Sequence, residues 1–397
     1  MSEVLFWSSA AVIAETYLVF PATIAARGRW RARPPLADDV TPSVTVVVAA
    51  HDEGAGIAAK LASVLSGSYP PNLLDVVVAS DGSADDTVEQ ASIDDPRVQV
   101  LDLPRLGKAG ALNAAIAAAG GEIVVFTDAN SRFAPDTLAR LVRPFADPTV
   151  GGVAGDQRYD RGEPGAPIDA TVDGERRYWD LDRWLKQAES AAGNVIGATG
   201  ALYAVRRELI DEVPDGVTDD FTTSTGVIAR GHRLVFAPDA AVYEPVSTSV
   251  DAEFRRKVRI VTRGLRGVAH RRELLDPRAH GFYSYQLLNH KVLRRLMAFP
   301  LATLLLASIG ASRRSPFYRL ALVGQLGVYV PAAIALAAPR SRLGRSRPCG
   351  MAAYFCLVNA AGAVGAWNLL TGRQIDRWTP DRQSPVAPVA DPEAVAS

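Results

Sequence analysis

The distribution of hydrophobic residues divides the chain into apolar ends and a patterned middle. Val4 to Ala26 is apolar and long enough to cross a hydrocarbon core of about 30 Å. Leu320 to Ala338 and Met351 to Gly372 have the same character, whereas Leu296 to Gly310 is shorter and contains a proline. The three longer stretches predict transmembrane helices, and the shorter one predicts a thin span or a re-entrant segment.

Between these ends, short apolar runs alternate with amphipathic stretches. The runs predict strands at Ser43–Ala50, Leu73–Ser80, Val98–Leu103 and Ile123–Phe126, and the stretches predict helices at Gly56–Gly67, Thr87–Ser92 and Ala111–Ala119. A short apolar run bounded by turn residues is typical of a strand covered on both faces. Its alternation with helices indicates βαβ units. We therefore expect an α/β domain with a mostly parallel sheet, flanked by N- and C-terminal transmembrane helices.

These patterns predict five parts along the chain. They are an N-terminal anchor with a basic juxtamembrane segment (1–35), an α/β domain (36–250), amphipathic interface helices (251–295), C-terminal transmembrane helices (296–372) and a Pro- and Ala-rich tail expected to be disordered (373–397). The first span lacks a basic n-region and an obvious cleavage site, so it is interpreted as a retained anchor.

Arginine placement predicts the orientation of the α/β domain. Arg27, Arg29, Arg31 and Arg33 follow the first span, and the positive-inside rule then places the next domain in the cytoplasm. The basic loop 340–347 would also lie inside, but the arginines at 313–319 would then lie outside, against the rule. The topology of the C-terminal spans therefore stays open.

Overall charge and cysteine content exclude several classes of function. Lys plus Arg equals Asp plus Glu, at 43 each, so no net field favours a nucleic-acid partner. The two cysteines, Cys349 and Cys356, fall in one apolar segment, and they make neither a disulfide framework nor a four-ligand zinc site.

Acidic residues follow three of the predicted strands. Glu53, Asp81 and Asp128 each stand at a strand end, with Asn130 two residues beyond the last. Open α/β sheets bind ligands at the carboxyl ends of their strands. A single carboxylate at this place is also commonly a helix cap, and for Asp81 alone the two interpretations have equal support. Three such residues at one edge predict a polar cleft.

Six segments in a fixed order resemble a known enzyme family. They are VVVAAHDEG, VASDGSADDT, RLGKAGALNAAI, VVFTDANS, ATGALYAVRRE and VTDDF. Together they resemble the inverting family 2 glycosyltransferases of the GT-A fold, relatives of the membrane synthases of hyaluronan, chitin and cellulose. The resemblance covers Ser43 to Gly267 and implies a nucleotide-sugar donor, with a UDP-sugar as the expected one.

The resemblance also implies a divalent cation, Mg or Mn. A cation stabilises the negative charge that grows on the leaving diphosphate, and hard cations bind oxygen ligands. The DxD metal motif of the family corresponds here to Asp128, Ala129 and Asn130. Asn130 offers only a neutral carbonyl, so it either completes the metal site or faces the sugar.

Further donor contacts are implied for Glu53, Asp81 and Lys108. By resemblance, the two acids would hold the uracil and ribose, and Lys108 would lie near the nucleotide or its phosphates. The segment GKAGALN lacks the spacing of a P-loop, which excludes that motif. For Lys108 alone, a solvated turn lysine is the ordinary interpretation.

The segment VTDDF resembles the TED motif of the family, whose last residue is the catalytic base. This assigns the base to Asp220 and the preceding acidic position to Asp219. Direct transfer to a hydroxyl requires such a group within hydrogen-bond reach of the acceptor proton. The alternative is an acidic turn that caps the following helix.

Acceptor and sugar contacts are implied at two further segments. Asp156 and Arg158 would line the acceptor side, and Thr199 and Gly200 would lie against the sugars, where a glycine permits close backbone approach.

An arginine-rich segment matches the QxxRW motif of the family only in part. Arg259 is retained and would clamp the diphosphate, whereas Arg256 and Ile260 replace Gln and Trp. The Trp belongs to the acceptor platform of processive synthases, so its replacement argues against the formation of long polymers. Arg256 is expected to contact the acceptor or the sugar. The same helix is also suited to lie on anionic headgroups.

The sequence therefore predicts a multi-pass protein of the cell membrane with a cytoplasmic catalytic domain. It would transfer a hexosyl or N-acetylhexosaminyl group to a growing polysaccharide or glycan of the cell envelope. One alternative is transfer of a single sugar to a polyprenyl phosphate or glycolipid, and another is a catalytically silent, nucleotide-binding membrane subunit. A nicotinamide-binding protein is a third and weaker alternative, because no GxGxxG follows a strand.

Overall fold

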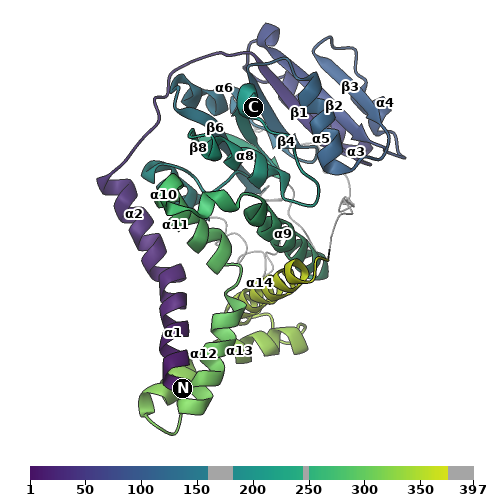
Figure 1. Ribbon diagram of the computed structural model, residues 1–397. Coiled ribbons are helices and arrows are strands. Elements are labelled where there is room, and N and C mark those ends of the chain that lie inside the picture. The colour runs from purple at the N-terminus through teal and green to yellow at the C-terminus, as the bar shows by residue number, and fades with distance from the viewer. Residues whose placement is uncertain (160–181, 245–249, 374–397) are drawn as a thin grey trace, which may run out of the picture.

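The computed structural model describes residues 1–159, 182–244 and 250–373. A mixed sheet with helices on both faces forms one end of the molecule, and a group of long helices forms the other (Figure 1). From residue 374 onward, the tail predicted to be disordered lies outside the described residues.

The sheet has eight strands in the order β3–β2–β1–β4–β7–β6–β8–β5. Their bounds are β1 Val44–Ala50, β2 Leu74–Asp81, β3 Val98–Leu103, β4 Ile123–Asp128, β5 Arg132–Phe133, β6 Val150–Tyr159, β7 Tyr203–Arg206 and β8 Arg233–Glu244. Parallel pairs are β1–β2, β1–β4, β2–β3 and β6–β8, and antiparallel pairs are β4–β7, β6–β7 and β5–β8. The mostly parallel α/β sheet predicted from the sequence is confirmed.

The central strand β1 shows why the apolar runs fold this way. All seven of its residues are buried. Successive side chains of a strand point to opposite faces. Val44, Val46 and Val48 accordingly enter one core with helix α3 (Gly54–Leu65). Val47 and Ala49 enter a second core with helices α5 (Gly107–Ala118) and α8 (Asp219–Ala229). Two covered faces require apolar residues at every position, which is the pattern read in the sequence.

Helices and helical turns complete the domain. Their bounds are α3 Gly54–Leu65, η2 Pro71–Leu73, α4 Thr87–Ala91, α5 Gly107–Ala118, α6 Thr137–Val142, η3 Arg143–Ala146, η4 Arg207–Leu209 and α8 Asp219–Ala229. Helices α3 and α5 begin before their predicted starts, at Gly54 and Gly107, so Lys108 lies in the first turn of α5 and not on a solvated turn. Helix α8 begins at Asp219.

A second group of helices connects the sheet domain to the far end of the molecule. In chain order they are α9 Val250–His270, η5 Arg272–Leu275, α10 Pro277–His280, α11 Phe282–Leu287 and the π-helical η6 Leu288–Leu293. Figure 1 shows α9 beside α14 and beneath the sheet domain, with α10 and α11 on the same side as α8.

Among the residues that the structure describes, three helices are long and apolar enough to cross a membrane. They are Ser2–Trp30, which comprises α1 Ser2–Ala14, the π-helical η1 Glu15–Val19 and α2 Phe20–Trp30, together with α13 Pro316–Ala337 and α14 Arg347–Leu370. A fourth candidate is a broken one, because Phe282–Leu293 and α12 Ala298–Ala311 meet at 66°. Helices α1, α12 and α13 gather at the end farthest from the sheet (Figure 1). The three longer apolar stretches of the sequence are therefore helices.

Substitution of two neighbouring glycines before β4 tests how tightly the sheet is packed. A Cβ atom at Gly121 would lie 2.6 Å from the Thr45 backbone nitrogen, whereas one at Gly120 would meet nothing within 4 Å. We expect Gly121→Ala to lower stability by about 1–3 kcal/mol because a backbone atom must shift. Gly120→Ala, the matched control, should change stability by less than about 0.5 kcal/mol. Thermal unfolding in detergent measures both, and equal melting temperatures would contradict this packing.

Candidate active site

Acidic residues at three strand ends lie along one edge of the sheet. Asp81 and Asp128 are the last residues of β2 and β4, and Glu53 follows β1 at the N-cap of α3. Strand β1 lies between β2 and β4 and runs parallel to both. All three carboxyl ends therefore meet at the place where α/β sheets bind ligands.

Asp81 is engaged in holding the turn before α5. Its side chain is fully buried, and its Oδ1 accepts hydrogen bonds from the backbone N–H groups of Leu106 and Gly107 at 2.6 and 2.8 Å. Its Oδ2 lies 3.1 Å from a guanidinium nitrogen of Arg105. Asp81 is not the N-cap residue of a helix, but it accepts the backbone N–H groups at the start of α5; its contact with a nucleotide remains a prediction.

The turn between β1 and α3 carries Glu53 toward the same edge. Asp52 adopts a left-handed backbone conformation, with φ 53°, and its side chain accepts a hydrogen bond from the Ala84 N–H at 2.8 Å. Burial raises the pKa of Glu53 to about 7, and the charges of Asp128, Asp85 and Asp52 add to the effect. Glu53 therefore belongs electrostatically to the same acidic edge as Asp128.

Lys108 links the acidic edge to helix α8. Its ammonium lies 3.0 Å from Asp128 Oδ1 and 3.1 Å from Asp219 Oδ2. Burial lowers the pKa of Lys108, but the charges of Asp128 and Asp219 raise it more, so the net pKa is raised. Lys108 is thus a charged bridge between two residues that lie 91 positions apart in the chain (219 − 128).

Asp219 and Asp220 occupy the first turn of α8, where the helix dipole favours negative charge. Their environments differ. Burial raises the pKa of Asp219, but Lys108 and Arg263 lower it more, and the net pKa falls. Burial, together with the charge of Asp219, raises the pKa of Asp220 to about 6. Two adjacent carboxyls with separated pKa values are suited to separate roles, one as an ion-pair partner and the other as a proton acceptor.

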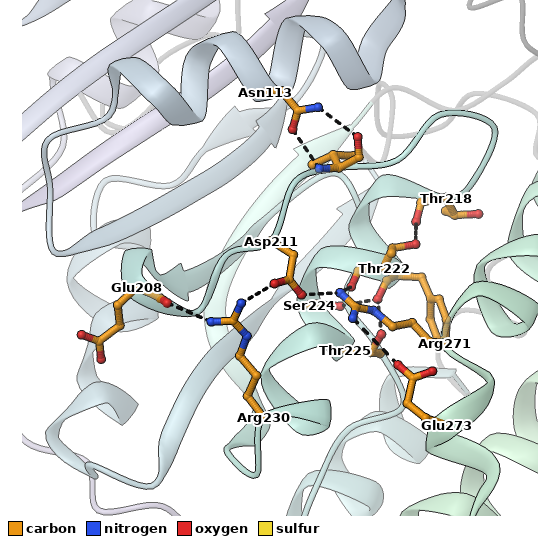
Figure 2. Close-up of polar contacts among 12 residues, drawn as sticks. Asn113, Glu208, Asp211, Thr218, Thr222, Ser224, Thr225, Arg230, Arg271 and Glu273 are labelled. Atoms are coloured by element: carbon orange, nitrogen blue, oxygen red, sulfur yellow. Dashed lines mark hydrogen bonds and ion pairs between the residues drawn. The ribbon is translucent and has the colours of Figure 1, made fainter.

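A cluster of ion pairs packs against helix α8. Figure 2 shows Asp211 between Arg230 and Arg271, both of which it binds. Arg271 Nη2 lies 2.8 Å from Asp211 Oδ2 and also donates to the Thr222 carbonyl at 3.4 Å. A Cβ at Gly226 would lie 2.9 Å from the same nitrogen, so the glycine permits this close approach. Since Arg271 follows α9, the cluster connects α8 to α9.

The loop that leads into α8 has its own support. Asn113 of α5 donates to the Val213 carbonyl at 3.0 Å and accepts from the Val213 N–H at 2.8 Å (Figure 2). Arg263 of α9 donates to the Val217 carbonyl at 2.9 Å. Two elements, α5 and α9, therefore fix the approach of the chain to Asp219 and Asp220.

Gly200 lies against Asp128, whereas Thr199 pairs with Leu202 in an isolated bridge. A Cβ at Gly200 would be 2.9 Å from Asp128 Oδ2, so the glycine backbone lies close to this carboxylate. The neighbouring Ala201 carbonyl accepts a hydrogen bond from Thr127 Oγ1 at 2.7 Å. The predicted sugar-facing segment and the DxD-like segment thus form one packed unit.

Lys60 lies beneath this unit and was missed in the sequence. Its side chain is buried, and its ammonium donates to Thr127 Oγ1 at 2.6 Å and to Ser131 Oγ at 2.9 Å. Burial lowers the pKa of Lys60 to about 7, although Asp128 and Glu244 act in the opposite direction. A signal was present, because Ile57, Lys60, Leu61 and Val64 are spaced as the buried face of one helix.

Glu244, at the end of β8, is a second residue missed in the sequence. Its carboxylate accepts a hydrogen bond from Gln157 Nε2 at 2.6 Å. Burial and the charge of Asp128 raise the pKa of Glu244 to about 7. The sequence carries no local signal for it, because its neighbours arrive through the pairing of β6 with β8.

Asp156 and Arg158 contact each other. Asp156 is buried, with its two oxygens 2.7 Å from Arg158 Nε and 3.0 Å from Arg183 Nε. Both arginines also donate to the Pro238 carbonyl. The pair therefore has a structural role on β6, and its contact with an acceptor remains a prediction.

Arg256 and Arg259 lie in the N-terminal half of α9. Both are partly buried, and the charge of Arg256 opposes the raised pKa of Glu244. Ile260 is 39% exposed at the position of the family tryptophan. Helix α9 thus carries Arg256, Arg259 and Arg263 along the site, and their substrate contacts remain predictions.

Asp128 is the residue predicted to offer a carboxylate to a divalent cation at this edge. Asp128 is 36% exposed, and Asn130 beside it is also exposed. Within residues 1–159, 182–244 and 250–373, no three His, Cys, Asp or Glu side chains are grouped to hold a metal. Mg²⁺ is commonly bound by one or two carboxylates together with substrate phosphates. The site therefore fits a cation shared with a diphosphate, and not one held by the protein alone.

Comparison with known proteins identifies relatives of this chain. The family described as "Glycosyltransferase like family 2" matches residues 42–262. An N-acetylglucosaminyltransferase of Rhizobium meliloti is 28% identical over 244 residues, which are 55% of this chain and 54% of the relative. A poly-beta-1,6-N-acetyl-D-glucosamine synthase of Staphylococcus aureus is 24% identical over 64% of this chain and 61% of the relative. The chain thus matches between half and two thirds of the length of these relatives.

A solved structure extends the similarity over nearly the whole chain. The mannosyltransferase PcManGT from Pyrobaculum calidifontis, in complex with GDP-Man and Mn²⁺, has a TM-score of 0.70 and 26% identity, and it covers 94% of this chain and 100% of its own. The similarity therefore includes the helices outside the family match.

Substitution of Lys60 tests whether the buried ammonium places the Asp128 turn. We expect Lys60→Met to weaken binding of a nucleoside diphosphate with Mn²⁺ about tenfold or more, because small displacements of a positioning group are costly. Titration calorimetry measures the affinity.

The matched variant is Lys60→Met/Thr127→Val/Ser131→Ala, which replaces the whole buried network with apolar groups. Such replacement commonly restores stability, so we expect the melting temperature to recover while the affinity stays low. Recovery of both would assign Lys60 a purely structural role.

Proposed function

The chain belongs to glycosyltransferase family 2, and from this premise we propose that it is a membrane-bound inverting glycosyltransferase that moves a sugar from a nucleotide-sugar donor to a hydroxyl of a growing polysaccharide or glycan. The observation that carries the proposal is the Lys108 bridge between Asp128 and Asp219. Lys108 brings Asp128, which is assigned to the donor, close to the acidic pair of α8, which is assigned to the acceptor. A transfer between two substrates requires such groups to lie side by side.

Asp220 is the base in this proposal. Its carboxylate takes the proton of the acceptor hydroxyl as that oxygen forms a bond to the anomeric carbon. The bond from this carbon to the diphosphate breaks, and its electron pair leaves with the phosphate oxygen. A single displacement inverts the configuration, so an α-linked donor gives a β linkage. The raised pKa of Asp220, about 6, suits a base near neutral pH.

Asp219 has a positioning role. Its ion pair with Lys108 and the charge of Arg263 keep it ionised. The ionised carboxylate raises the pKa of its neighbour and holds the lysine near the phosphates. Arg259 on α9 is the residue assigned to the leaving diphosphate, because a guanidinium matches phosphate geometry.

Asp128 would hold a divalent cation together with the donor diphosphate. When bound, Mg²⁺ or Mn²⁺ supplies positive charge to the leaving group. The neighbour PcManGT was solved with Mn²⁺ and GDP-Man, which supports this assignment and makes guanosine the alternative to the expected uridine. Glu53 and Asp81 are assigned to the nucleoside.

The acceptor is proposed to be a glycan, on the names of the two relatives. The second candidate is transfer of a single sugar to a polyprenyl phosphate or glycolipid, which is favoured by Ile260 in place of the family tryptophan. The candidate spans support a multi-pass location, and the arginines that follow the first span support a cytoplasmic catalytic domain.

Donor turnover tests the assignment directly. Protein in native-lipid membranes is supplied with UDP- and GDP-sugars, with and without Mn²⁺, and release of nucleoside diphosphate is measured. We expect metal-dependent release with a UDP-sugar, and a loss of about 10²–10⁴-fold in Asp220→Asn because the base is removed. Asp75→Asn, an exposed acid near the opposite end of β2, serves as the control, and equal losses in both variants would count against Asp220 as the base.

The pH dependence of kcat tests the division of roles between Asp219 and Asp220. Because the pKa of Asp220 is raised, the group is protonated below about pH 6, and we expect kcat to fall on the acid side of that value. In Asp219→Asn the neighbouring negative charge is removed, so the acid limb should move to lower pH. An acid limb that stays in place or moves upward would contradict the assignment.

A further inference from the structure

A cavity at the end of the first long helix lies outside the proposed active site. It has a volume of about 300 Å³ and is lined by Thr23, Ala26, Arg27, Trp30, Arg31 and Phe282. Five of these residues belong to the C-terminal half of Ser2–Trp30 or follow it directly, and Phe282 begins α11. The volume is at the lower end of the range for ligand pockets, about 300–1,000 Å³.

The lining carries positive charge with no acidic residue among its members. Arg27 stacks on the Phe282 ring at 4.3 Å, and its Nε donates to the Ala192 carbonyl at 3.4 Å. A guanidinium has five N–H donors, and within the described ranges the other four of Arg27 have no acceptor. The side chain of Arg31 has no hydrogen-bond or ion-pair partner among the described residues. Two cations thus line one cavity without an anion to balance them.

The walls of the cavity are held in place by packing. Phe20 and Ile24 of α2 pack with Leu185 in a buried cluster that also contacts Phe282. A Cβ at Gly28 would lie 3.0 Å from the Ala188 carbonyl, so α2 lies close to helical residues 182–192. Tyr285 of α11 donates to Glu15 Oε1 at 2.7 Å. The cavity is therefore a built feature between two helices and not a gap between mobile side chains.

The position of the cavity relative to the lipid bilayer indicates its ligand. A hydrocarbon core of about 30 Å takes about 20 residues of helix at 1.5 Å per residue. Counted from Val4, the apolar stretch leaves this core near Thr23, so residues 23–31 fall at headgroup level. Trp30 is 80% exposed at the rim, and exposed indoles are typical of that level.

We propose that the cavity between α2 and α11 binds the phosphate group of a membrane lipid through Arg27 and Arg31. The arginine forks match phosphate geometry, and a phosphate supplies the missing negative charge. Two lipids could supply this phosphate: a bulk anionic phospholipid, or a polyprenyl phosphate of the kind that carries sugars in glycan synthesis. The inference rests on the proposed membrane location and not on the transferase reaction.

The test uses the full chain in nanodiscs, with lipid retention after detergent release measured by native mass spectrometry. One nanodisc contains phosphatidylcholine with a minor fraction of phosphatidylglycerol, and another replaces the latter with a polyprenyl phosphate. Arg27→Gln/Arg31→Gln removes the two lining cations. Arg29→Gln/Arg33→Gln is the matched control, since it removes the same charge from the same segment outside the cavity.

We expect the wild type and the control to retain the anionic lipid, and Arg27→Gln/Arg31→Gln to lose about tenfold or more of it. Preference for one of the two lipids identifies the source of the phosphate. Equal loss in both double variants would show general attraction to an anionic surface and overturn the proposal, as would no retention by wild-type protein that has inserted.

A second variant covers the case in which the double substitution fails to fold. Ala26→Leu fills the cavity without changing charge, and we expect it to lose retention to a similar degree. Retention unchanged in a folded Ala26→Leu variant would overturn the proposal. Donor turnover, measured separately, decides the proposed enzyme activity independently of either result.

Discussion

The Lys108 ammonium, between Asp128 and Asp219, is the contact on which the site depends. Without it, two carboxylates from different elements would face each other across a partly buried space, at a Coulombic cost that grows as water is excluded. The lysine compensates both charges and fixes α5, β4 and α8 relative to one another. Its position in the first turn of α5 is set by Asp81, which accepts the Leu106 and Gly107 N–H groups. Asp81, which was expected to contact the nucleotide, thus also positions Lys108 between the two carboxylates.

The same bridge explains how adjacent carboxyls acquire different proton affinities. Asp219 is ionised against Lys108, and its charge raises the pKa of Asp220 to about 6. The ion pairs of Asp211 with Arg230 and Arg271 hold α8 farther along the helix (Figure 2). Rigid support of this kind lets a buried acidic pair keep its geometry while only one member titrates near neutral pH.

The sequence predicted the parts of the fold that local patterns encode. The fully buried β1 and the strand-end position of Asp128 follow from short apolar runs, and the family follows from an ordered set of short motifs. The pairing of β6 with β8, and with it the place of Glu244, could not be predicted because it joins distant segments. Lys60 could have been noticed as a charge on the apolar face of α3, but its partners, Thr127 and Ser131, are visible only once α3 packs on β4. The Asp211 cluster leaves no pattern, since ion pairs between distant segments have no period.

The measurement that tests the bridge most directly is the affinity for a nucleoside diphosphate with Mn²⁺ in Asp219→Asn, determined both with Lys108 present and in a Lys108→Met background. If Lys108 links the two carboxylates, removal of Asp219 leaves the ammonium bound to Asp128 alone, where it competes with the cation. The account predicts weaker binding in Asp219→Asn and no further effect of this substitution once Lys108 is Met. An equal effect of Asp219→Asn in both backgrounds would contradict it.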